Sequence, residues 1–378
     1  MPVLRVFQVF IDKVLGLSGG VKLERRSPLT IALALTAIAA LYAGYWFFIA
    51  HQLTQGYAAL QSEQAKNRVA IASRALTHEG FPARVVLKLD APAVQKSGAP
   101  ELAYTADGVT VALSPFEPTR GTLETTGGPQ HLAFHDPRQG LSLDATSTHA
   151  KGKLAFRGLA GALDYAQLWI DGLAGSARLS ADTGPAAFAA ARVEAILRPG
   201  RYAQNGTPQK ETVFALIGED VTLPEAAGRL LGTKLAYTMI DAQLTGGKGG
   251  PFNVDTLNRD GVRALRTFFE GDGRLDMTRL ALRWGALDAV AHGSLKLDAL
   301  HRPEGSLMIE VAGYRELLAA LSRENILKEG MANAIGSALD VLAAMRRDPM
   351  GRAAVVLICQ KGKLFVGPVE VATLKPLF

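Results

Sequence analysis

The sequence predicts an α+β protein in which an N-terminal transmembrane helix and a helical stalk precede a predominantly antiparallel β meander with a few packed helices. Three observations support this fold class. One uncharged apolar run lies near the N-terminus, short stretches of alternating apolar and polar residues fill most of the chain after it, and the helical patterns are isolated. Because helices do not alternate regularly with strands, a doubly wound parallel sheet is not expected.

The 378 residues are enough for two packed cores. We expect an amphipathic segment, a transmembrane helix, a helical stalk, a β-rich region and an α+β region. In chain order these cover residues 1–26, 27–50, 51–80, 81–249 and 250–378.

The first segment, residues 2–17, carries apolar side chains at helical spacing, among them Phe7, Phe10 and Val14. A helix of this kind fits the inner surface of a membrane. It is also apolar nearly all round, so packing against a partner inside the bilayer is an equal alternative.

The run from Pro28 to Ala50 contains no charged residue. As a helix it spans about 34 Å, enough for the hydrocarbon core of about 30 Å. A cleaved signal peptide is the competing interpretation. Its apolar core would be shorter and would end in small residues, whereas this run ends in bulky aromatic side chains. We therefore expect an uncleaved anchor.

Arg25 and Arg26 directly precede the run, and the next basic residue after it is Lys66. The positive-inside rule then places residues 1–26 in the cytoplasm and the bulk of the chain across the membrane. Aromatic residues near the C-terminal end of the run suit the membrane–water interface. The anchor residues are Arg25, Arg26, Tyr42, Tyr45 and Trp46.

Residues 51–80 have apolar side chains at steps of three to five and no proline, which predicts the stalk. Gly80 and Pro82 then end the helix. From Arg84 the apolar period changes to two, and Gly, Pro, Asp and Asn separate the runs. This pattern is typical of an antiparallel meander with one apolar face. The predicted helical interruptions are residues 223–232, 254–271, 314–325 and 328–347.

Three alternating runs in the C-terminal region place their apolar side chains on one face of the predicted sheet. Small residues along part of this face leave room for a docked helix, which makes it a filled core, or for a lipid chain, which makes it a groove. Both alternatives stay open. The candidate face consists of Leu280, Leu282, Trp284, Ala289, Ala291, Leu295, Leu297, Leu307 and Ile309.

The residues that commonly carry catalysis do not form a convincing site. His131 and His135 lie in a predicted strand, where a spacing of four residues separates them by about 13 Å. No G-x-S-x-G elbow and no P-loop occur. Glu225 fits the first turn of a short helix. The single cysteine, Cys359, fits a buried strand position. We therefore expect no enzyme, no metal and no cofactor.

Two parts of the sequence resemble a family of uncharacterised bacterial membrane-anchored proteins, the domain of unknown function 2125 (DUF2125). The first is "LYAGYWFF" followed by a helical pattern and "GFP". The second is "GDGRLDMTRLALRWGALDAVAHGSLKLDAL" with the later "KGKLFVGPVEVATLKPL". A looser likeness, carried by the single anchor and turns such as "IDGLAGSARLS", connects the chain to AsmA-type β-groove proteins. The family resemblance implies no catalytic residue, and the AsmA likeness implies lipid binding.

These observations predict a single-pass protein of the bacterial inner membrane whose bulk lies in the periplasm. The function that we expect is non-enzymatic: scaffolding or binding an envelope protein partner through the β-rich body. Lipid binding or transfer in an apolar β groove is the alternative, and an envelope hydrolase is a remote one. The net charge of +6 comes from scattered residues, so nucleic acid is not an expected partner.

Overall fold

The computed structural model describes residues 28–138, 140–156, 163–178, 184–199, 212–246, 262–346, 348, 351–367 and 369–377. Two compact units divide the chain between Ile49 and Ala50. The fold class predicted from the sequence is confirmed: an apolar N-terminal helix precedes a large antiparallel sheet with a few helices.

The N-terminal helix, α2, covers Pro28–Lys66. By length and composition its stretch Ala32–Lys66 qualifies to cross a membrane. The side chains of Leu33, Leu35 and Leu41 are all more than half exposed. The predicted segment 1–26, including Arg25 and Arg26, lies outside the described residues.

The predicted stalk is wrong beyond Lys66. The helix ends there because Arg68 adopts a left-handed backbone conformation, with φ of 61°. The following residues form β1 (Val69–Ala72) and β2 (Ala75–Glu79). Their apolar spacing is compatible with a helix, but β1 pairs with Ala93–Lys96, and this long-range pairing overrides the local pattern.

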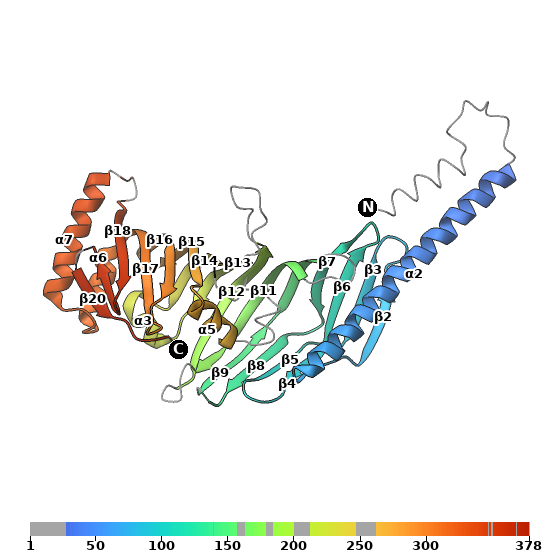
Figure 1. Cartoon of the computed structure of the whole chain (residues 1–378), viewed down its shortest axis with the longest axis horizontal. Helices are drawn as coiled ribbons and strands as arrows, with labels where there is room; N and C mark the ends of the chain where they lie inside the picture. The colour runs from blue at the N-terminus through green and yellow to red at the C-terminus, as the bar shows by residue number, and fades with distance from the viewer. Residues whose placement is uncertain are drawn as a thin grey trace, which may run out of the picture. The chain divides into compact units, whose positions relative to one another are not determined.

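Twenty strands within the described residues form one antiparallel sheet, coloured in chain order in Figure 1. The N-terminal part of the sheet contains β3 (Val85–Asp90), β4 (Ala93–Lys96), β5 (Glu101–Thr105), β6 (Gly108–Ser114), β7 (Glu117–Thr126), β8 (Gln130–Asp136), β9 (Leu141–Ser147) and β10 (His149–Phe156). The rest contains β11 (Leu163–Arg178), β12 (Ala186–Pro199), β13 (Thr212–Thr222), β14 (Lys234–Thr245), β15 (Arg274–Trp284), β16 (Leu287–Leu297), β17 (Pro303–Ala312), β18 (Ala353–Gln360), β19 (Lys363–Val366) and β20 (Val369–Thr373).

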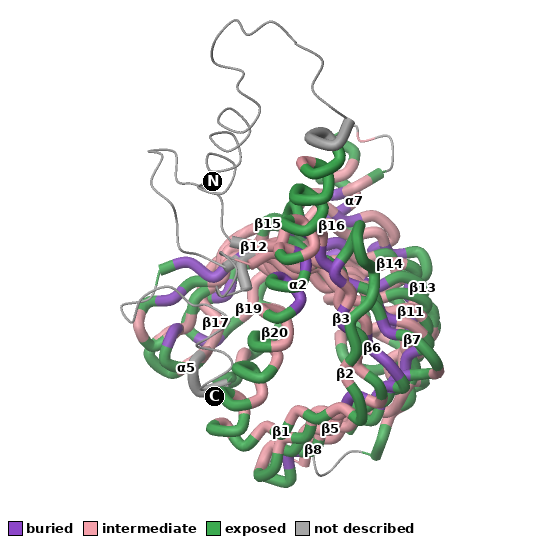
Figure 2. Tube along the Cα trace, turned by 90° about the vertical axis from the view of Figure 1, so that its right-hand side faces the viewer, coloured by how far each residue is buried: buried purple, intermediate pink, exposed green. Residues whose placement is uncertain are grey.

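The first ten strands are the halves of five long, bent strands. The two halves of one bent strand pair with the two halves of the next, so that β2 pairs with β3 and β1 pairs with β4. This arrangement repeats along the chain. The last two halves, β9 and β10, both pair with the single strand β11. The whole body is therefore a next-neighbour meander. Figure 2 shows β1, β5 and β8 at an angle to β2, β3 and β6, which is the bend between the two halves.

One extra residue is inserted where the two halves of a bent strand join, and this insertion produces the bend. We call the line of these junctions across the strands the seam. In the fifth bent strand the buried residues are Ala145 and Ser147 before the seam, and Ala150 and Gly152 after it. Because of the one extra residue, the buried positions change from odd to even residue numbers. The same face of the sheet therefore stays buried while the strand turns. Backbone hydrogen bonds continue along the seam, for example from Thr148 N to Asp171 O (3.0 Å).

The helices cover part of the sheet near its C-terminal end. They are α3 (Glu225–Leu231), α5 (Val262–Glu270), α6 (Tyr314–Arg323) and α7 (Glu329–Arg346). The helices predicted at 223–232, 314–325 and 328–347 are confirmed. Of the one predicted at 254–271, residues 262–270 are helical and residues 254–261 lie outside the described residues.

Candidate apolar binding face

Side chains of one face of the sheet form continuous apolar rows across the strands. Residues that pair directly in an antiparallel sheet share a face, so the strand register defines each row. The central row is Leu87, Val111, Leu123, Gly152, Leu168, Ala195, Leu216, Ile240, Leu280, Ala291, Ile309 and Val355. With strands about 4.8 Å apart, this row extends for about 53 Å.

A second row runs beside the central one and is equally free of charge. It consists of Val85, Leu113, Gly121, Leu154, Ala166, Leu197, Phe214, Ala242, Met277, Gly293, Leu307 and Leu357. We call the face that bears these two rows the apolar face.

The opposite face has a different composition. One row there is Lys88, Thr110, Glu124, Lys151, Trp169, Glu194, Ile217, Met239, Ala281, Val290, Glu310 and Ala354. The Glu124 carboxylate of this row lies 3.3 Å from His149 Nε2, measured from Oε1. The charged half of this row suits contact with water, whereas its apolar stretch from Ile217 to Val290 includes the buried Ala281. The apolar face lacks charge along both of its rows, and it needs a cover.

The protein's own helices cover the apolar face at its C-terminal end. Leu287, Val311 and Ala353 of the sheet form a buried cluster with Ile335 and Leu339 of α7. Residues packed against this cluster include Leu282, Ala289, Ile309 and Val355 from the sheet, and Leu317 and Leu318 from α6.

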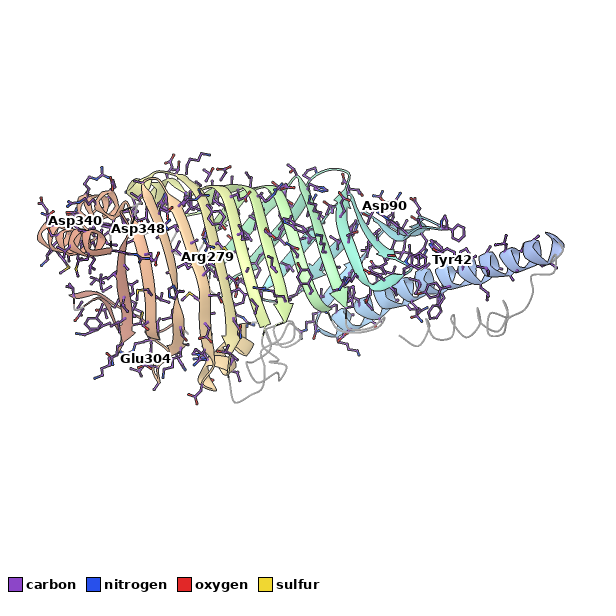
Figure 3. The ribbon with its side chains drawn as sticks, turned by 90° about the horizontal axis from the view of Figure 1, so that it is seen from above. Tyr42, Asp90, Arg279, Glu304, Asp340 and Asp348 are labelled. Carbon is purple, nitrogen blue, oxygen red and sulfur yellow. The ribbon has the colours of Figure 1, made fainter. Side chains whose placement is uncertain are left out.

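Polar contacts hold α6 against α7. The Tyr314 hydroxyl donates a hydrogen bond to Asp340 Oδ1 (2.9 Å), and the Arg315 guanidinium donates to both oxygens of the same carboxylate. Figure 3 labels Asp340 on α7 at this end of the sheet. Burial and the hydrogen bond to Asp340 raise the pKa of Tyr314, so its hydroxyl stays a donor at neutral pH.

The middle of the apolar face is less covered. Leu168 and Ala195 are only half-buried, and Leu216 is 46% exposed. To either side, Leu87 is 2% and Ala291 is 3% exposed. Phe268 and Phe269 of α5 pack near one border of this stretch, against Phe214 and Leu275. Leu216 is therefore the most exposed residue of the central row, and we call the part of the apolar face around it the open stretch.

The strand register places the predicted sheet-face residues on neighbouring strands. Leu280 pairs with Ala291, which pairs with Ile309, and Leu282 pairs with Ala289. Trp284 donates a hydrogen bond from Nε1 to Gly232 O (2.6 Å) after α3. Leu295 and Leu297 continue the face opposite Gly305 and Pro303, and Leu307 pairs with Gly293. Since α6 and α7 cover Leu282, Ala289 and Ile309, this part of the face is a filled core. The anchor residues Tyr42, Tyr45 and Trp46 lie in α2.

The titratable residues that the sequence singles out are dispersed. His131 and His135 lie in β8, and His131 Nε2 is 3.2 Å from Asp144 Oδ1. Glu225 starts α3, as predicted. Asp220 has φ of 48° and lies at the seam in β13.

A pocket of about 600 Å³ is lined by β4, β5, β8, β9 and β11; its lining includes Gln95, Ala103, Ala133 and Asp144. The register assigns these four residues to the face opposite Leu102 and Phe134.

Comparison with known proteins identifies the family. The model of a family described as "Uncharacterized protein conserved in bacteria (DUF2125)" matches residues 46–375. The chain belongs to the DUF2125 family. The match begins at Trp46 near the middle of α2 and includes every described strand of this DUF2125 protein. No curated protein and no solved structure matches the chain. The likeness to AsmA-type proteins is not shown by these comparisons and stays a prediction.

Sequence reasoning found only three of the twelve strands that form the apolar face of this DUF2125 protein, namely β15, β16 and β17. Leu216, Leu168 and Ala195 also lie in alternating stretches, but alternation within one strand does not show which residues of distant strands align. The shift from odd to even positions, as between Ala145 and Ala150, hides the continuity further. The sequence did contain a signal for the bent strands. In each of them the apolar residues change between odd and even residue numbers at the seam.

Proposed function

We propose that this DUF2125 protein is anchored in the inner membrane by α2 and binds the hydrocarbon chains of lipids on its apolar face. The observation that carries the proposal is a pair of uncharged rows across twelve strands in which Leu216 is 46% exposed. Burial of each methylene group contributes about 0.8 kcal/mol. A chain that buries ten methylenes in the open stretch would therefore gain up to about 8 kcal/mol before its entropy cost.

The proposed topology follows the distribution of charge around the anchor. Basic residues precede the apolar run and do not recur until Lys66, which favours a cytoplasmic N-terminus and a periplasmic body. The proposal assigns a binding role and no chemical reaction to the protein, and it needs no cofactor.

A protein partner on the same face is the second candidate. The geometry of α7 favours it, because this helix packs Ile335 and Leu339 against the sheet and so shows that the face accepts an apolar helix. A helix of an envelope protein would occupy the open stretch in the same manner.

One experiment separates the two candidates. A photo-crosslinking amino acid is placed at the position of Leu216 in the full chain in living cells, and the adducts are identified by mass spectrometry. The matched control has the same amino acid at Met308, which is 39% exposed but lies on the opposite face. We expect lipid adducts from position 216 and few from position 308. Protein adducts at position 216 would support the partner instead. Equal lipid labelling at both positions, or no adduct at position 216, would contradict a ligand on the apolar face.

A charge at the opening provides a second test. Leu216→Glu places a carboxylate where the hydrocarbon would lie, and desolvating it costs several kcal/mol. We expect the amount of lipid that copurifies with the full chain to fall at least about tenfold, whereas Met308→Glu leaves it unchanged. Because Leu216 is exposed, circular dichroism of both variants should match the parent chain.

A further inference from the structure

The apolar face continues beyond the seam, where its side chains are less deeply covered. Ala145 shares this face with Gly152 of the central row, and the strand register extends it across six strands. The row there consists of Ile71, Val94, Tyr104, Leu132, Ala145 and Gly175. Val94 in β4 is half-buried, whereas Leu87 in β3, the other half of the same bent strand, is 2% exposed. Figure 2 shows β1, β5 and β8 mostly in the colours of half-buried and exposed residues.

The next row of the same face contains one cation. The row consists of Val69, Lys96, Leu102, Phe134, Leu143 and Ala177. A charged side chain among apolar neighbours is costly unless its charge reaches water or a partner. Lys96 is half-buried, and in the described part of the chain its ammonium group has no hydrogen-bond or ion-pair partner. Its charge is therefore available to a ligand on the apolar face.

A second cation lies at the same corner of the sheet. The Ser97 N–H donates a hydrogen bond to Arg68 O (3.1 Å), which brings the turn after Lys96 next to Arg68. A Cβ atom on Gly98 would lie 3.7 Å from Arg68 Nη1, so the guanidinium extends along this turn. Among the described residues this guanidinium also has no partner. The first strand pair therefore brings two unpaired cations together.

The corner has no acidic group that offsets these two cations. Glu101, the next acidic residue along the chain, lies on the opposite face, in register with His135 of β8. Glu63 in α2 is balanced in charge by Lys66, three residues further on. Neither carboxylate forms a described ion pair with the two cations. An anion from outside the described chain would complete the corner.

The length of the row beyond the corner suits a lipid chain. From Lys96 to Ala177 the row crosses four strand spacings, about 19 Å. One leaflet of a hydrocarbon core of about 30 Å is about 15 Å thick. A lipid whose head lies at Lys96 would therefore have Leu102, Phe134 and Leu143 beneath its chain along the whole of its length.

We propose that Lys96 and Arg68 bind the anionic headgroup of a lipid, a carboxylate or a phosphate, while its chain lies on the apolar row beyond them. Ammonium and guanidinium groups donate charge-assisted hydrogen bonds to both kinds of anion. The inference rests on the proposed lipid binding and names the class of lipid, an anionic amphiphile.

Two ligands that differ only in their heads test the proposal. A radiolabelled saturated fatty acid and the alcohol with the same chain are titrated onto the full chain in mild nonionic detergent at neutral pH. We expect the acid to bind at least about tenfold more tightly, because hydrogen bonds to charged groups are stronger than neutral ones. The double variant Lys96→Gln, Arg68→Gln should lose this preference through weaker binding of the acid alone, whereas Lys96→Arg should retain it.

Lys151→Gln is the matched control, because Lys151 lies on the opposite face. It should keep the preference for the acid. Equal binding of acid and alcohol to the parent chain, or a preference that survives in the double variant, would overturn the headgroup site and leave lipid binding intact. Displacement of the fatty acid by an equal concentration of inorganic phosphate would identify a site for a free anion instead. Binding of neither ligand to the parent chain would contradict the proposed function itself.

Discussion

Neighbouring residues of a strand can have opposite environments, and Cys359 and Ile358 of β18 illustrate this. Cys359 is 8% exposed, whereas Ile358 is 36% exposed on the other side of the sheet. Burial raises the pKa of the Cys359 thiol because the thiolate would be poorly solvated there. The sequence predicted a small buried side chain at this position, and its burial is confirmed.

The Cys359 thiol should therefore be inert in the folded protein. A thiolate is the reactive form, so we expect no labelling by a thiol reagent at pH 8 until denaturant is added. The variant Ile358→Cys should gain one rapidly labelled thiol without unfolding. Fast labelling of the parent chain under native conditions would contradict the placement of Cys359.

Among the secondary-structure elements, the bent strands make the body more than a flat meander. β11 continues through the seam without interruption, and Gly172 lies at its bend with φ of 60°. A Cβ atom at this position would lie 2.6 Å from Thr148 Oγ1. Both the backbone conformation and the space therefore require glycine at this point.

Gly172→Ala should destabilise the body by about 2 kcal/mol, since a non-glycine residue in this conformation costs on the order of 1–3 kcal/mol. Gly330→Ala is the matched control, because a Cβ there would meet nothing within 4 Å and the position is helical. We expect thermal unfolding followed by circular dichroism to shift downward for the first variant only. Equal midpoints for the two variants would show that the seam tolerates side chains at Gly172.

At the scale of the whole molecule, the function that we propose depends on α2 as an uncleaved anchor. The full chain should stay in the membrane fraction after an alkaline carbonate wash, and its N-terminus should precede the apolar run. Introducing Leu35→Arg together with Ile38→Arg should abolish insertion, because each arginine near the centre of a helix costs about 2.5–3.5 kcal/mol. His51→Arg, just beyond the run, should have no effect.

A soluble protein whose N-terminus begins after residue 45 would identify the run as a signal sequence instead. In that case the body would be released from the membrane, and the proposed role of the apolar face would have to be fulfilled without an anchor.

The sequence by itself determined the local patterns and their chemical consequences. The absence of charge from Pro28 to Ala50 predicted an apolar helix long enough to cross a membrane. The alternation around Leu280 and Ala291 predicted strands with one apolar face. These predictions succeeded because helix length and strand alternation depend on near neighbours along the chain.

Only the tertiary structure decided which distant residues align and what covers them. The pairing of Val69 with Lys96 turned a predicted helix into a strand. Strand pairing joined Leu87 to Val355 in one row across twelve strands. The packing of α6 and α7 filled the face at Ala289 but left Leu216 exposed. Strand pairing and burial are long-range properties, so a pattern read along one strand does not contain them.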